Sequence, residues 1–135
     1  MTDLKAKYVL VVEDEPRNAA LISVMLKIAG VQHVYECRSG LVITPTVQQM
    51  PAVDLILLDL QLPGEDGYQI YKRLRADSAF SRTAIVAVTA QVMPDDVERA
   101  DKAGFDGFLG KPLNFDRFPS QIQRLLSGER VWDPR

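Results

Sequence analysis

The stretch Asp54–Gly67, DLILLDLQLPGEDG, decides how the chain is expected to fold. Four consecutive apolar residues at positions 55–58 lead to Asp59, and a Pro-Gly pair follows shortly afterwards. A short apolar run bounded by turn residues predicts a strand that is buried on both faces of a sheet. Asp59 then stands where the strand ends, which is where open α/β sheets bind ligands. Within this stretch alone, a turn or helix-capping aspartate is an equally good interpretation.

The rest of the chain repeats the same order of strand and helix. Strands are expected at 8–12, 34–37, 55–59, 84–88 and 105–109. Helices are expected at 16–29, about 40–50, from about 67, at 94–103 and over 115–126, the second of them irregular. Such alternation predicts a parallel sheet with helices on both faces. We expect one domain over residues 1–135, with a core of about 7–127 and a tail at 128–135.

Composition narrows the classes of protein that this chain can be. Its 135 residues are 47% apolar, enough for one packed domain, and a net charge of −2 gives no general attraction to nucleic acid or anionic membranes. No apolar run approaches the ~20 residues that span a bilayer, and the N-terminus is not a secretory signal. The lone cysteine, Cys37, excludes an internal disulfide and fits a reducing compartment, so we expect a cytoplasmic protein. With His33 as the single histidine, a His-rich metal site is excluded by count.

Residues with reactive side chains stand at the ends of four expected strands. They are Glu13 and Asp14 after the first strand, Asp59 at the third, Thr89 at the fourth and Lys111 after the fifth. Because parallel strands end at one edge of a sheet, these groups are expected to meet there. Clustered carboxylates need a counter-charge, and oxygen ligands without histidine or thiolate suit Mg²⁺ or Mn²⁺. A carboxylate can attack phosphorus and form an aspartyl phosphate, while a metal, a lysine and a hydroxyl hold the phosphoryl oxygens.

The combination resembles the receiver domains of two-component response regulators. The matching marks are Glu13-Asp14, Asp59 with Pro63 and Gly67 after it, Thr89-Ala90 and Lys111-Pro112, and the resemblance covers roughly residues 7–127. It implies a flavodoxin-like (βα)5 three-layer sandwich with a parallel five-stranded sheet in the order 2-1-3-4-5. It also implies that Asp59 accepts a phosphoryl group from a sensor histidine kinase or a histidine phosphotransfer protein.

The resemblance assigns further roles to single residues. The implied Mg²⁺ ligands are Glu13, Asp14, Asp59 and the backbone carbonyl of Gln61, while Thr89 and Lys111 bind the phosphoryl oxygens. Phe108 matches the aromatic switch position, which turns inward as the threonine moves, although it lacks the hydroxyl of the commoner tyrosine. The bond before Pro112 would be cis, and Gln61 and Gln91 match positions that tune hydrolysis of the phosphoaspartate.

The implied function is a stand-alone, phosphorylation-dependent switch without an output domain of its own. Its output would be protein binding through the face formed by the fourth helix, the fifth strand and the fifth helix, with no direct nucleic-acid contact and no membrane insertion. It would not be an enzyme beyond transferring a phosphoryl group to its own Asp59 and later hydrolysing the adduct.

Two other functions are weaker alternatives. One is a receiver-like interaction module that is never phosphorylated, for which clustered carboxylates have no physical purpose. The other is a Mg²⁺-dependent phosphohydrolase, which would need an acid at the position of Gln61. Outside the strand ends, His33 is expected on the surface or on an edge strand, and Lys72, Arg73 and Arg75 on a solvated helix face. Trp132 could fold back on the domain, contact a partner or belong to a linker.

Overall fold

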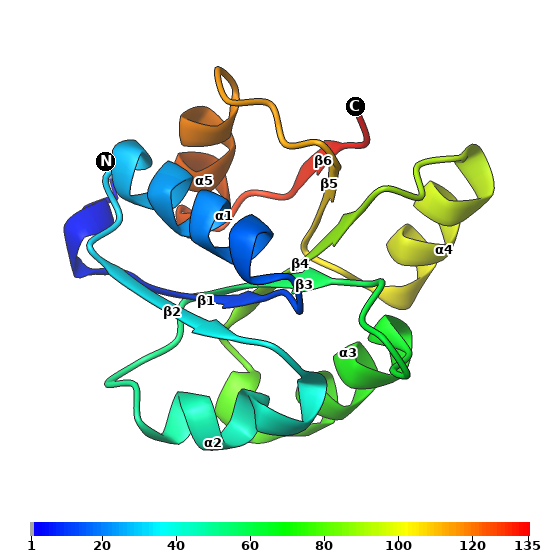
Figure 1. Ribbon diagram of the computed structural model, residues 1–135, viewed down its shortest axis with the longest axis horizontal. Coiled ribbons are helices and arrows are strands. Elements are labelled where there is room, and N and C mark those ends of the chain that lie inside the picture. The colour runs from blue at the N-terminus through cyan, green and yellow to red at the C-terminus, as the bar shows by residue number, and fades with distance from the viewer. Residues whose placement is uncertain (1) are drawn as a thin grey trace.

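A parallel six-stranded sheet in the order β2-β1-β3-β4-β5-β6 forms the middle layer of the protein (Figure 1). The computed structural model describes residues 2–135. Its strands are β1 (Tyr8–Val12), β2 (His33–Cys37), β3 (Leu55–Asp59), β4 (Ala84–Thr89), β5 (Gly107–Gly110) and β6 (Val131–Asp133). The flavodoxin-like fold and the order of the first five strands are as predicted, but the expectation of a five-stranded sheet was wrong by one strand.

Helices cover both faces of this sheet, which gives the predicted three layers (Figure 1). On one face lie α1 (Pro16–Ala29) and α5 (Phe118–Leu126), and on the other lie α2 (Ile43–Gln48), α3 (Gly67–Ala76) and α4 (Pro94–Ala103). Short 3-10 helices occupy Leu4–Ala6, Gly40–Val42 and Ser78–Phe80. Successive strand residues point to opposite faces, so Val9 and Val11 join one apolar core while Leu10 and Val12 join the other.

The ends of α1 follow the signals in the sequence. The Glu15 carboxylate accepts a hydrogen bond of 2.8 Å from the Arg17 N–H just as Pro16 opens the helix. Gly30 closes it with a φ of 113°, a left-handed conformation that favours glycine. Gly104 closes α4 in the same way with a φ of 100°.

Two local expectations need correction. The last helix begins at Phe118 rather than at residue 115, because Pro119 is tolerated only in a first turn, and Phe115 is 56% exposed. Arg75 does not point into solvent with Lys72 and Arg73. Its guanidinium donates to the carbonyls of Phe80 and Thr83 and pairs with the Asp106 carboxylate.

The segment expected to be a tail carries β6, which pairs with β5. The register places Gly107 opposite Val131, Phe108 opposite Trp132 and Leu109 opposite Asp133. Trp132 therefore folds back on the domain, one of the three possibilities that the sequence left open. A three-residue strand has too little periodicity to be predicted, and its pairing depends on an edge that only the folded sheet presents.

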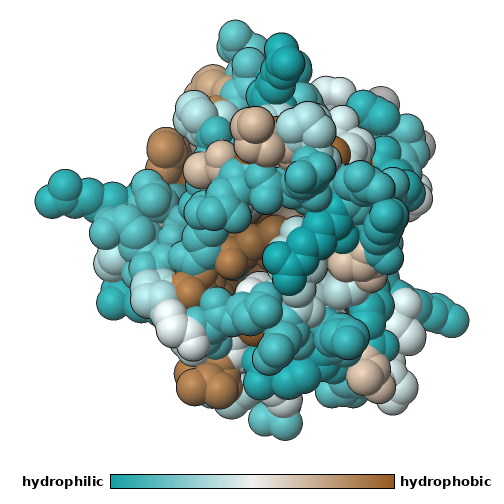
Figure 2. Space-filling view, turned by 90° about the vertical axis from the view of Figure 1, so that its right-hand side faces the viewer, coloured by the Kyte–Doolittle hydropathy of each residue, from teal (hydrophilic) through white to brown (hydrophobic). Residues whose placement is uncertain are grey.

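The side of the molecule that carries α4 and the loops after β3 and β4 is hollowed. Figure 2 looks onto this side and shows apolar residues on the floor of a hollow that polar residues surround. No helix within residues 2–135 is both long enough and apolar enough to cross a bilayer.

Candidate functional site

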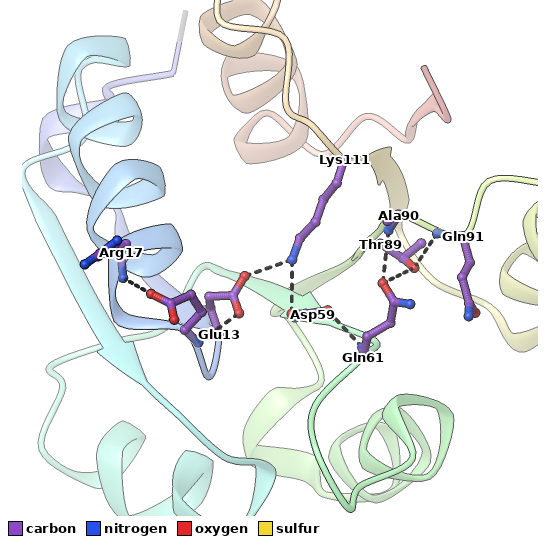
Figure 3. Close-up of polar contacts among 9 residues, drawn as sticks. Glu13, Arg17, Asp59, Gln61, Thr89, Ala90, Gln91 and Lys111 are labelled. Atoms are coloured by element: carbon purple, nitrogen blue, oxygen red, sulfur yellow. Dashed lines mark hydrogen bonds and ion pairs between the residues drawn. The ribbon is translucent and has the colours of Figure 1, made fainter.

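The parallel sheet brings the ends of β1, β3, β4 and β5 together, as predicted (Figure 3). β3 pairs with β4 so that Asp59 lies opposite Val88, and β4 pairs with β5 so that Thr89 lies opposite Gly110. We call the group of Glu13, Asp14, Asp59, Thr89 and Lys111 the strand-end site. Its members come from segments that are up to about a hundred residues apart in the chain.

Lys111 joins two buried carboxylates in this site. Its Nζ lies 2.8 Å from Glu13 Oε1 and 3.1 Å from Asp59 Oδ2 (Figure 3). The carboxylate-bearing side chains of Glu13 and Asp59 are only 2% and 5% exposed, whereas that of Lys111 is 23% exposed. The ammonium thus reaches in from the rim and offsets part of a concentrated negative charge.

Three carboxylates in the site lie close enough to share one cation. An oxygen from each of Glu13, Asp14 and Asp59 lies within 4.8 Å of the other two. Backbone groups hold two of these side chains, because Gln61 N–H donates to Asp59 Oδ1 at 2.8 Å and Glu15 N–H donates to Glu13 Oε2 at 3.2 Å. Asp14 is half-buried at the same edge.

The two buried carboxylates respond differently to this environment. Burial raises the pKa of Asp59, and its bonds to Gln61 N–H and Lys111 do not offset that cost. Burial also opposes ionisation of Glu13, but the hydrogen bonds from Lys111 and Glu15 outweigh it and lower the pKa of Glu13. The pKa of Lys111 is raised because its two carboxylate partners outweigh its own burial. Burial therefore outweighs the favourable contacts of Asp59 but not those of Glu13.

Thr89 lies on the other side of Asp59, within a small polar network. Its Oγ1 accepts a hydrogen bond of 3.0 Å from Gln91 N–H and lies 3.4 Å from Gln61 Oε1. That same amide oxygen accepts a bond of 3.2 Å from Ala90 N–H. The Gln61 side chain thus bridges the loops after β3 and β4, a contact that the sequence alone did not predict.

The predicted aromatic switch position, Phe108, lies on β5, and the predicted cis-proline, Pro112, follows that strand. Phe108 is fully buried and packs against Trp132, with ring centroids 5.6 Å apart. The Lys111–Pro112 peptide bond is cis. His33, the first residue of the edge strand β2, stacks on Tyr8 with ring centroids 4.3 Å apart and lies outside the site.

An apolar groove of about 340 Å³ adjoins the strand-end site between α1 and the segment after β5. Glu13 and Lys111 line its polar end, while Leu21, Ile22 and Met25 line its apolar wall. Leu21 is 56% exposed there. Sequence reasoning missed this groove, because it depends on how closely α1 approaches the segment after β5.

Relatives with known roles share both the sequence pattern and the fold. The polar-differentiation response regulator DivK of Brucella ovis is 32% identical over 120 residues, which are 89% of this chain and 96% of DivK. The signal transduction histidine-protein kinase BarA of Escherichia coli is 34% identical over 126 residues, 93% of this chain but 14% of BarA. The chain therefore spans only a small part of some relatives that it matches.

The solved structures that this chain resembles are also receiver domains and response regulators. The receiver domain of the sensor histidine kinase PA1611 from Pseudomonas aeruginosa, which holds a magnesium ion in its active-site cleft, is 30% identical with a TM-score of 0.77. That match covers 90% of this chain and 98% of the other. The chemotaxis response regulator CheY4 of Vibrio cholerae is 26% identical with a TM-score of 0.77, over 88% and 98% of the two chains. The family description that matches residues 9–123 is the response regulator receiver domain, and this chain belongs to that family of two-component systems.

Proposed function

We propose that this protein is a phosphorylation-dependent switch of a two-component phosphorelay, working as a single receiver domain with Asp59 as the phosphoacceptor. The observation that carries the proposal is the environment of Asp59. Its carboxylate lies at the mouth of β3, beside a lysine ammonium at 3.1 Å and two further carboxylates. Sensor histidine kinases or histidine phosphotransfer proteins are the proposed donors, and the cytoplasm is the proposed location.

The donor set fits a hard divalent cation. Glu13, Asp14 and Asp59 offer carboxylate oxygens within 4.8 Å of one another, and burial raises the pKa of Asp59, so a cation bound there would favour its ionised form. The proposed Mg²⁺ ligands are these three carboxylates and the carbonyl of Gln61, and Mn²⁺ would suit the same oxygens. When bound, the ion would neutralise negative charge on the phosphoryl oxygens.

The side chains of the site then divide the transfer among them. One Asp59 oxygen forms a bond to phosphorus as the bond to the donor's nitrogen or oxygen breaks, and the leaving group keeps that bonding electron pair. Lys111 binds one phosphoryl oxygen through its ammonium, and the Thr89 hydroxyl turns to donate to another. Water would reverse the modification by hydrolysing the phosphoaspartate, at a rate that Gln61 and Gln91 would tune.

Binding of a partner is the proposed output. Movement of Thr89 toward the phosphoryl group would be passed to Phe108 and to the face formed by α4, β5 and α5, where a downstream protein would dock. Beyond transfer to its own aspartate and hydrolysis of that adduct, the protein would catalyse no reaction.

Intact mass after incubation with acetyl phosphate and Mg²⁺ tests the proposal. We expect a gain of one phosphoryl group that requires the metal and is absent in Asp59→Asn, while Asp54→Asn, a matched change at the other end of β3, still accepts the group. No gain in folded protein that binds Mg²⁺ would refute phosphoacceptance and favour a constitutive interaction module. Steady turnover of acetyl phosphate without an adduct would instead favour a phosphohydrolase.

A further inference from the structure

Residues 129–135 lie beyond the part of the chain that the receiver family describes, which ends at residue 123. They form β6, which covers the edge of β5 between α4 and α5 (Figure 1). The proposed output face therefore has the protein's own C-terminal segment lying across it. We call residues 129–135 the C-terminal strap.

Polar contacts fasten the strap at both of its ends. Asp133 Oδ2 accepts a hydrogen bond of 2.8 Å from Gln121 Nε2 and pairs with Arg117 Nη1 at 3.0 Å, which ties it to α5 and the turn before it. Arg117 also donates to the carbonyl of Arg135. On the α4 side, Arg130 pairs with Asp101 at 2.8 Å. Contacts to two helices keep the strap in one position across the sheet edge.

Apolar packing fits the middle of the strap to β5. Val131 is 3% exposed and enters the core beneath α1 and α5. On the other face of the sheet from Val131, Trp132 packs against Phe108. The Arg130 guanidinium lies 4.6 Å from the centre of the Trp132 ring. At Gly110 the backbone approaches so closely that an added Cβ would lie 2.5 Å from the carbonyl carbon of Pro134. The strap thus fits the present position of β5 with no room to spare.

We propose that the C-terminal strap is an autoinhibitory element, which holds the β5 edge closed in the resting protein and is released when Asp59 is phosphorylated. The inference rests on the proposed function, because phosphorylation supplies the trigger. Release would uncover Phe108 and free the backbone groups of β5 that pair with β6. Such an edge is a surface to which an extended segment of another protein can add.

A short path joins the strand-end site to the strap. Thr89 lies opposite Gly110 in the sheet, and the Lys111 N–H donates to the Thr89 carbonyl at 2.8 Å. A phosphoryl group that draws the Lys111 ammonium and the Thr89 hydroxyl toward itself therefore pulls on both neighbours of Gly110. The backbone of Gly110 packs closely against Pro134, so a movement of Gly110 either pushes Pro134 away or breaks its contact with β5. Packed contacts of this kind respond in discrete steps rather than by smooth deformation.

Trp132 provides the measurement, since it is the single tryptophan of the chain and lies in the strap. Acrylamide quenching of its fluorescence is followed in the full chain with Mg²⁺ and acetyl phosphate, and the phosphorylated fraction is read by intact mass in the same samples. We expect quenching to rise in proportion to that fraction and to stay constant in Asp59→Asn. An adduct without a change in quenching refutes the strap alone. No adduct in folded protein refutes the proposed function, and the coupling falls with it.

A second measurement works from the strap toward the site. Asp133→Ala removes the acceptor of Arg117 and Gln121, and Asp116→Ala is a matched control because Asp116 is exposed and has no side-chain hydrogen bond or ion pair within residues 2–135. Coupling between two sites is reciprocal, so loosening the strap should tighten binding of beryllofluoride with Mg²⁺ by about fivefold. Equal affinities in Asp133→Ala, Asp116→Ala and the unaltered protein would overturn the proposal, provided that all three have the same far-ultraviolet circular dichroism.

Discussion

Replacing Lys111 with methionine tests how the strand-end site balances its charge. Methionine keeps an unbranched stem but removes the ammonium at 2.8 Å from Glu13 and 3.1 Å from Asp59. Loss of one partner from a buried ion pair usually costs about 3–5 kcal/mol. Because the Lys111 side chain is 23% exposed and solvent reaches the rim, we expect the free energy of unfolding at pH 7 to fall by about 2–3 kcal/mol without Mg²⁺.

Urea unfolding followed by far-ultraviolet circular dichroism, with chelator present, measures this loss. Lys102→Met is the matched control, because Lys102 also pairs at 2.8 Å, with Glu98, but those side chains are 76% and 61% exposed. Exposed pairs contribute little, so the control should lose less than about 0.5 kcal/mol. A loss in Lys111→Met no larger than in the control would refute the reasoning.

Added Mg²⁺ supplies the second half of the test. Without Lys111 the carboxylates of Glu13, Asp14 and Asp59 repel one another more strongly, so a bound cation should relieve more strain. Saturating Mg²⁺ should therefore stabilise Lys111→Met by more than it stabilises the unaltered protein, and the stability gap should narrow. An equal gain in both proteins would show that the lysine and the metal do not offset the same charge.

Three further predictions follow from single residues. Folding raises the pKa of Asp59, so Asp59→Asn should stabilise the Mg²⁺-free protein at pH 7. This gain in stability should shrink as the pH falls through the folded-state pKa, because Asp59 is then protonated in the unaltered protein as well. Thermal unfolding across pH measures the gain, and a gain that does not change with pH would contradict the prediction. Burial raises the pKa of the Cys37 thiol from 9.0 to about 11, so its alkylation at pH 8 should be on the order of 100-fold slower than in urea-unfolded protein. The free energy of unfolding should also fall between pH 9 and 11, because only the thiol of the unfolded protein ionises there. Equal alkylation rates in the folded and unfolded protein would argue against this burial. Gly110→Ala should cost about 1–3 kcal/mol and shift the emission of Trp132, because the new methyl group meets Pro134; an unchanged emission spectrum would contradict that contact.

Strong local patterns in the sequence predicted most of the core. The apolar runs before Asp59 and Thr89 are buried strands because they have no polar position that could face water. Gly30 and Gly104 end their helices because both adopt a positive φ. The start of α5 was misplaced because the aromatic spacing of Phe115 and Phe118 resembles a helix face, whereas Pro119 limits how far the helix extends toward the N-terminus.

Contacts between distant segments could not be predicted in the same way. The sequence places Arg75 on the basic face of α3, but its partners are the carbonyls of Phe80 and Thr83 and the Asp106 carboxylate, which α3 does not contain. The bridge from Gln61 to the Ala90 N–H depends likewise on how closely two loops approach. Local pattern carries no information about such distances.

For this protein, the sequence by itself determined the parallel α/β architecture, the residues that gather at the strand ends and the family to which the chain belongs. Those features depend on local periodicity and on the rule that parallel strands end at one edge. The tertiary structure alone decided that Lys111 joins Glu13 to Asp59, that burial raises the pKa of Asp59, and that residues 131–133 close the edge of β5. The reason is physical: charge balance and edge pairing depend on distances between groups that lie far apart in the chain, and only folding sets those distances.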